Sequence, residues 1–275
     1  DDERRARLAR RHAVAPAHRV GDPVAATRAV AVLHATEPAS VHLAVHARAD
    51  VGRDDVDRSL QEDRSVVRQL AMRRTMFVFP RDLLPATWGS AAARTAATER
   101  ARLAKDLVRA GVTEDGEAWL ARAEAEILAA LGSAPDGLTA TELRAAAPAM
   151  DVRTDLPSSA IVPGRFLTVL GAEAKVVRGT NTSHWRGLRR RWRVMDGWLG
   201  AVPEPLDARA GYAELVRRWL ERFGPGTETD LVWWLGATKG AVRAALADVR
   251  AVEVVLDTGA TAYVLEGDLE PEPAV

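Results

Sequence analysis

Three residues within four positions, His34, Thr36 and Glu37, combine a titratable ring, a hydroxyl and a carboxylate. Because a histidine ring changes charge near neutral pH, His34 can orient or deprotonate a water molecule. Thr36 can donate or accept a second hydrogen bond, and Glu37 can supply negative charge or fix the tautomer of His34. These residue types therefore predict a site that holds and activates water.

A purely structural role for the same segment stays open. Pro38 suits the first turn of a helix, so Thr36 would be the N-cap of that helix. His34 would then be the last residue of the preceding helix. The two roles are compatible, because a cap places its side chain at the mouth of a helix, where it can face a cleft.

His42 and His46 raise the question of a metal. They are four residues apart and would share a helical face, with Glu37 close in sequence. However, the sequence has no H-E-x-x-H pattern and no cysteine, so thiolate ligands and disulfides are excluded. We therefore predict neither a metal nor another cofactor.

Two arginine-bearing segments are candidate contacts for a nucleic acid. The segment Trp185–Arg193, WRGLRRRWR, interleaves five arginines with two tryptophans, as in a β-wing that enters a groove. A second pair of arginines precedes the segment Thr75–Phe79, which reads as a strand. Plain surface charge, with the tryptophans in the core, is the alternative. The candidate contacts are Arg73, Arg74, Trp185, Arg186, Arg189, Arg190, Arg191 and Arg193.

The elements that must position these residues follow from caps, turns and periodicity. Near residues 208–265 the pattern gives a helix, a capped second helix, a Gly236 turn, a third helix and a hairpin, which is the winged-helix order. The middle of the chain repeats this order less clearly. Helices are expected near 1–12, 23–34, 38–48, 53–72, 81–87, 91–110, 114–131, 160–171, 208–223 and 238–249. Strands are expected near 75–79, 175–178, 191–194, 252–256 and 261–265.

The predicted fold is mainly α with small β-hairpins, an α+β arrangement of tandem winged-helix modules. We expect a helical or winged-helix module with the His34 segment at 1–112. A middle winged-helix module with the arginine-rich hairpin should span 113–203, and a C-terminal one 204–275. Winged helices also serve in packing, dimerisation and protein interaction, so the fold alone does not require DNA contact.

The composition narrows the class of protein. The 275 residues carry a net charge of zero, which argues mildly against a simple nucleic-acid binder, and only three of the 38 basic residues are lysines. No apolar run reaches the roughly 18 residues of a membrane span, and the start, DDERRARLARRHAV, lacks a secretory signal. We expect a cytoplasmic monomer that does not enter a membrane.

Three collinear segments resemble motifs of one known protein family. Val32–Pro38 (VLHATEP), followed by LAVHAR, resembles that family's V-G-L-Q-A-Q-D-P and LALWAR. Val67–Met76 (VRQLAMRRTM) resembles its R-x-x-x-M-R-G-T stretch leading into a strand. Arg222–Thr227 (RFGPGT), with Asp230 and Trp234–Gly236, resembles its G-P-A-T…D…W-L-G stretch. The family that these segments resemble is the AlkZ/YcaQ-type DNA glycosylases.

The resemblance implies a monofunctional glycosylase that removes alkylated purines, including bulky or crosslinking antibiotic adducts, from double-stranded DNA. The family's catalytic Gln-x-Gln or Gln-x-Asp matches His34-Ala35-Thr36 here, so His34, Thr36 and the adjacent Glu37 are the expected catalytic residues. A further departure is that the family's C-terminal β-domain has no counterpart before Val275. The rival prediction, favoured by the missing glutamines, is a non-catalytic winged-helix DNA-binding or regulatory protein.

Overall fold

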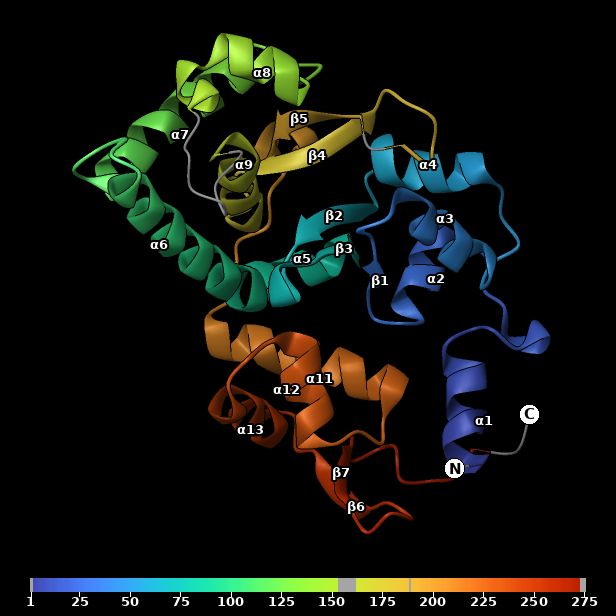
Figure 1. The fold of residues 1–275 in the computed structure, drawn as a ribbon. Helices are drawn as coiled ribbons and strands as arrows, with labels where there is room; N and C mark the ends of the chain where they lie inside the picture. Colours follow the sequence, from blue (N-terminus) through green and yellow to red (C-terminus); the bar gives the residue numbers. More distant parts are fainter. Residues whose placement is uncertain (1, 153–161, 188, 273–275) are drawn as a thin grey trace. The chain divides into compact units, whose positions relative to one another are not determined.

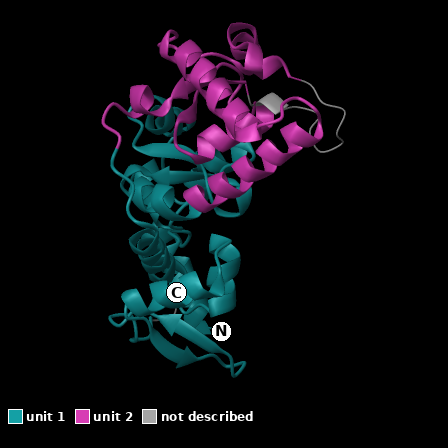
Figure 2. Ribbon diagram, turned by 90° about the vertical axis from the view of Figure 1, so that its left-hand side faces the viewer, with its two compact units in different colours: residues 1–91, 203–275 teal, residues 92–202 magenta. Residues whose placement is uncertain are grey.

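The computed structural model describes residues 2–152, 162–187 and 189–272. Contacts between residues divide the chain into two compact units (Figure 2). Unit 1 consists of residues 1–91 and 203–275, and unit 2 of residues 92–202. The three-module boundaries at 112/113 and 203/204 stay predictions. The predicted fold class is confirmed, because helices dominate and the strands form small antiparallel sets (Figure 1).

Within the described residues one order of elements occurs three times: a helix, a short extended segment, two helices and an antiparallel hairpin. The first copy lies in unit 1, and its two-residue strand β1 pairs with β3 to give the sheet order β1-β3-β2. This is a winged helix with a third strand added to the wing. Its elements are α2 (Pro23–Arg28), β1 (Leu33–His34), α3 (Pro38–His46), α4 (Arg53–Gln61), β2 (Val66–Leu70) and β3 (Met76–Pro80).

The other two copies replace the extra strand by a single bridging residue. In unit 2, Leu138 bridges to Trp192, and in the C-terminal part of unit 1, Gly226 bridges to Tyr263. The copy in unit 2 contains α7 (Gly116–Gly132), α8 (Ala140–Ala146), α9 (Val162–Ala172), β4 (Val176–Asn181) and β5 (Arg190–Val194). The C-terminal copy contains α11 (Ala208–Phe223), α12 (Glu228–Leu235), α13 (Lys239–Asp248), β6 (Val252–Val255) and β7 (Thr261–Val264).

The remaining α-helices precede the first copy or lie between the copies in the chain. They are α1 (Asp2–Arg11), α5 (Leu84–Thr87), α6 (Ala93–Arg109) and α10 (Met195–Leu199). In unit 2, α6 packs against α7 and α9 around a core that includes Leu107, Leu120, Ile127 and Phe166. None of the helices in the described part of the chain is both long and apolar enough to cross a bilayer.

Two predicted helices end early, and both differences concern the candidate site. The helix expected at 23–34 stops at Arg28, Ala31 takes a left-handed φ of 60°, and Leu33–His34 is strand. The helix expected at 53–72 ends at Gln61, and Arg64 at φ 52° turns the chain into β2. All five residues of β2 are buried, so its sequence shows no alternation from which a strand could be recognised. The helix expected at 160–171 is observed from Val162, and residues 160 and 161 lie outside the described residues.

The N-terminal helix α1 is tied to the C-terminal segment by ion pairs. The guanidinium of Arg11 donates to both carboxylate oxygens of Asp268, at 2.7 and 2.6 Å, and to Glu272 at 2.6 Å. Arg7, 3% exposed, also pairs with Asp268 at 2.8 Å. These two arginines therefore serve to join the ends of unit 1.

Candidate functional site

The segment that joins β1 to α3 presents two polar side chains on the same exposed side. His34 and Thr36 are exposed, whereas Ala35 between them is 4% exposed, as expected for extended backbone. The Nε2 of His34 lies 3.3 Å from the Oγ1 of Thr36, which is within hydrogen-bonding reach. The structure thus brings together the first two predicted catalytic side chains.

The position of His34 is set by the sheet beneath it. It pairs with Phe77 of β3, and the two rings meet edge to face at 5.7 Å between centroids. One residue further on, the Ala35 N–H donates to the Met76 carbonyl at 2.9 Å. His34 therefore does not end a helix, and its ring packs against β3, the strand that follows the Arg73–Arg74 turn.

Glu37, and not Thr36, is the N-cap of α3, and Pro38 occupies the first helical turn as expected. The prediction that Thr36 is the cap is therefore wrong. The Glu37 side chain makes no cap hydrogen bond and is exposed. Ser40 stabilises the segment instead, because its Oγ donates to the carbonyls of His34 at 3.0 Å and of Glu37 at 2.6 Å. The backbone is thus held while three polar side chains stay accessible.

This arrangement can hold one water molecule between a ring nitrogen and a hydroxyl, with a carboxylate on the following residue. Water typically makes two to four hydrogen bonds when it is ordered by protein groups. His34 Nε2 can accept a proton from such a water, and Thr36 Oγ1 can orient it.

Among the described residues no cluster of histidine, aspartate or glutamate suits a metal ion. His42 is 7% exposed, and its Nε2 lies 3.0 Å from the Asp57 carboxylate.

The Arg73–Arg74 turn is the tip of the first wing, between β2 and β3. Both residues are exposed and take left-handed φ angles of 54° and 56°, which is unusual for residues other than glycine. The guanidinium of Arg73 lies 3.9 Å above the ring of Trp233, on α12 of the C-terminal copy. Trp233 is 62% exposed, and sequence reasoning had not assigned it a role. The turn is therefore held by a cation–π stack within unit 1.

The arginine-rich hairpin of unit 2 divides into an exposed tip and a paired stem. At the tip, Arg186 and Arg189 are exposed, and Arg186 lies 5.8 Å from the ring of the half-buried Trp185. Leu188 lies outside the described residues. The tip is exposed and positively charged, as predicted for a wing that contacts DNA.

The stem arginines have structural partners. Arg190 is only 7% exposed. Arg191 donates to the carbonyls of Asp136 and Gly137 at 3.1 and 3.0 Å and pairs with Glu142 at 3.1 Å. Arg193 lies 5.2 Å from the ring of Trp198. DNA contact by the stem arginines stays a prediction, and within unit 2 these side chains are buried or engaged by the contacts given above.

The comparisons with known proteins agree with this architecture. The family described as DNA glycosylase AlkZ-like matches residues 27–275. The solved structure of the Streptomyces sahachiroi DNA glycosylase AlkZ is similar with a TM-score of 0.73. At 20% identity the match covers 97% of this chain and 70% of that one, and it shows a shared fold. No curated protein matches the chain significantly.

The family match covers the first copy from residue 27 onward, both other copies and the whole His34–Glu37 segment. It confirms the resemblance drawn from the three sequence segments and, with it, the predicted enzyme class. A DNA glycosylase takes DNA as its substrate, so the match also confirms DNA as a partner. The chain belongs to the AlkZ-like family of DNA glycosylases.

Proposed function

We propose that this chain is a monofunctional glycosylase for alkylated purines and that His34, Thr36 and Glu37 form its reaction centre. The observation that carries the proposal is the exposed pair of His34 Nε2 and Thr36 Oγ1, 3.3 Å apart, at the positions that match the family's Gln-x-Gln. The pair replaces two amides by a ring and a hydroxyl. Both sets of groups can orient a water molecule.

The reaction breaks the bond between C1′ of the sugar and N9 of the purine. The electron pair of that bond goes to the purine, where it neutralises the positive charge that alkylation at N7 placed on the ring. The water oxygen forms the new bond to C1′, and one of its protons passes to His34 Nε2. The products are a free base and an abasic site. Because the leaving group is already cationic, strong acid catalysis is unnecessary.

Glu37 supports the same step electrostatically. The transition state carries positive charge on the sugar, as in other glycosidic cleavages. The Glu37 carboxylate is exposed and makes no cap hydrogen bond, so its negative charge is available to stabilise that cation. Removing a preorganised electrostatic contact of this kind typically costs about a hundredfold or more in rate.

The substrate class we propose is a purine with a bulky adduct of a DNA-alkylating natural product, removed in self-resistance or repair. The three side chains lie on an exposed segment, and an open site accommodates a base that is too large for an enclosed pocket. The chain would act as a monomer. Duplex DNA would be held by the exposed Arg73, Arg74, Arg186 and Arg189 with Trp185, while Arg190, Arg191 and Arg193 hold the hairpin.

The proposal is tested by incubating the protein with duplexes that carry N7-methylguanine or bulky natural-product adducts at guanine N7 and adenine N3. Abasic sites are then scored by alkaline cleavage, with undamaged duplex as the control. We expect faster base release from at least one bulky adduct than from undamaged DNA. No release from any member of such a panel would overturn the proposed substrate class.

The monofunctional character has its own test. A bifunctional glycosylase needs an amine nucleophile that forms a Schiff base. Lys175 is unsuited to this role: although burial lowers its pKa, hydrogen bonds to Glu124 and Glu173 raise that pKa above its ordinary value. We expect no covalent protein–DNA product after borohydride treatment during base release, and a trapped adduct would contradict a water nucleophile.

A further inference from the structure

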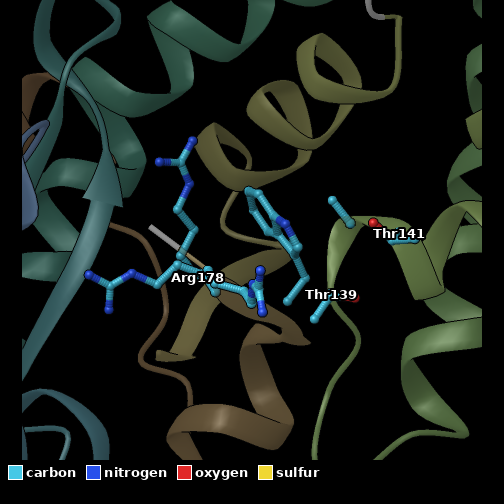
Figure 3. Close-up of a pocket in the computed structure, with 7 residues that line it drawn as sticks. Thr139, Thr141 and Arg178 are labelled. Atoms are coloured by element: carbon cyan, nitrogen blue, oxygen red, sulfur yellow. The ribbon is translucent and has the colours of Figure 1, made fainter. Parts of the chain in front are cut away.

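A pocket of about 650 Å³ opens between the hairpin and α8 in unit 2. Figure 3 shows Arg178 of β4 on one side of it, with Thr139, the N-cap of α8, and Thr141 of α8 on the other. The lining residues that the structure describes all belong to unit 2, whereas the His34–Glu37 segment belongs to unit 1. The lining residues are Thr139, Ala140, Thr141, Arg178, Arg189, Arg190 and Trp192.

Arg178 is the unusual member of this lining. Its Nε is buried and has no hydrogen-bond partner, and its guanidinium lies 5.3 Å from the ring of Trp192. Burial lowers the pKa of Arg178, without a carboxylate to offset the effect. A buried cation that lacks a counter-charge is costly, and an anion in the pocket would reduce that cost.

The charged residues that the structure describes in the lining of the pocket are all positive. Three arginines line it, and none of the described lining residues is acidic. Glu142, in the first turn of α8, is already engaged: it accepts from the Thr139 N–H at 2.7 Å and pairs with Arg191 at 3.1 Å. The hydroxyl of Thr139 is likewise used to cap α8. Arg178 and Arg189, with the exposed hydroxyl of Thr141, are therefore the donors that a ligand would meet.

We propose that this pocket binds a phosphodiester group of the DNA backbone. A tetrahedral anion suits a site whose described lining carries guanidinium groups and no carboxylate, because each guanidinium presents several N–H donors in a fixed plane. The contact positions the duplex and reads no sequence. This inference rests on DNA being the substrate of the chain, but not on the identity of the catalytic residues or of the adduct.

The test measures binding of undamaged duplex DNA by fluorescence anisotropy as a function of salt concentration. Arg178→Gln removes one phosphate contact, so the slope of log affinity against log salt should fall in magnitude by about 0.9. Affinity at low salt should fall about tenfold, as expected for a hydrogen bond to a charged group. Arg122→Gln is the matched control, since this exposed arginine of α7 undergoes the same charge change. It should leave the slope unchanged.

A second variant keeps the test valid if loss of the half-buried Arg178 unfolds unit 2. Arg189 lines the same pocket from an exposed position, so Arg189→Gln should lower the slope without lowering the melting temperature. A wild-type slope in folded Arg178→Gln and in Arg189→Gln would overturn the proposal. The proposal would also be overturned if inorganic phosphate, at matched ionic strength, stabilised the wild type while both variants kept the wild-type salt slope for DNA binding. Absence of base release leaves this test unaffected, because the duplex is undamaged.

Discussion

The junction before the second helix is built in two different ways within one chain. In unit 2 and in the C-terminal copy it is closed by a capping box, Thr139 with Glu142 and Thr227 with Asp230. In each box the threonine hydroxyl and the carboxylate satisfy backbone N–H groups of the helix end. In the first copy, Glu37 occupies the cap position without a side-chain cap hydrogen bond.

The difference shows how the first junction frees its polar side chains. Pro38 has no N–H, so the first turn of α3 has one donor fewer to satisfy. Ser40 fixes the loop by donating to two backbone carbonyls. The side chains of His34, Thr36 and Glu37 are therefore not needed as caps. An uncapped helix end is a local cost to stability, and such costs are common where function requires exposed groups.

Apart from the loss of His34, the largest effect on this comparison is expected from Glu37→Gln. If the carboxylate stabilises the sugar cation, single-turnover base release should slow about a hundredfold. The free energy of unfolding should change by only a few tenths of a kcal/mol, because no cap hydrogen bond is lost. Single-turnover kinetics and urea unfolding measure the two quantities. A normal rate with reduced stability would make Glu37 a cap like Thr139.

Arg191→Ala tests the closed junction of unit 2. Arg191 joins the hairpin to Glu142 and to the carbonyls of Asp136 and Gly137, so its loss should destabilise unit 2 by about 2 kcal/mol. Base release at saturating protein should stay normal. Calorimetry is the measurement, with the exposed Arg189→Ala as the control, for which we expect an unchanged melting temperature. Equal melting temperatures for both variants would show that the stem and the tip arginines contribute equally to the stability of unit 2.

Thr36→Ala should have a smaller effect on rate. Removing one hydrogen bond to the water corresponds to about 1 kcal/mol, or about a fivefold slower base release. Stability should be unaffected, since Thr36 is not the N-cap of α3. Urea unfolding measured alongside the kinetics separates the two contributions. A stability loss that matches the rate loss would assign Thr36 a structural role.

The smallest effect is expected from Thr139→Ala and Thr227→Ala. Each removes a threonine N-cap, which typically costs about 1 kcal/mol of stability. Neither residue belongs to the proposed reaction centre, so single-turnover base release at saturating DNA should equal that of the wild type. A rate loss comparable to that of Thr36→Ala would remove the distinction between the open junction and the closed ones.

The two copies whose junctions are closed by a capping box could largely be predicted from sequence, because the signals that start and end their helices are local. The αL Gly236 at the end of α12 is found where the sequence predicts a turn, and the Thr139–Glu142 box marks the start of α8 by an equally local signal. The elements of the first copy were harder to predict. A two-residue strand such as β1 has no periodicity, and the fully buried β2 resembles a continuation of the preceding helix.

The candidate site was found through a resemblance, and its geometry was not predictable. The spacing of His34 and Thr36 suggested chemistry, but only the strand pairing with Phe77 places both side chains on one exposed side. Sequence also did not separate the exposed Arg189 from the paired Arg191, since only the structure shows that Arg189 precedes β5, whereas Arg191 lies within it and reaches the carbonyls of Asp136 and Gly137. The roles of Trp233 and Arg178 depend on tertiary contacts with Arg73 and Trp192, which local sequence does not encode.

The most direct test of the central claim is single-turnover base release by His34→Ala and His34→Gln on an adduct that the wild type removes. Loss of the general base should slow His34→Ala by about a hundred- to ten-thousandfold. DNA affinity should change little, and His46→Ala, an exposed histidine on α3, should behave as wild type. His34→Gln restores the family's amide and should recover part of the rate. A wild-type rate in His34→Ala would place the reaction centre elsewhere.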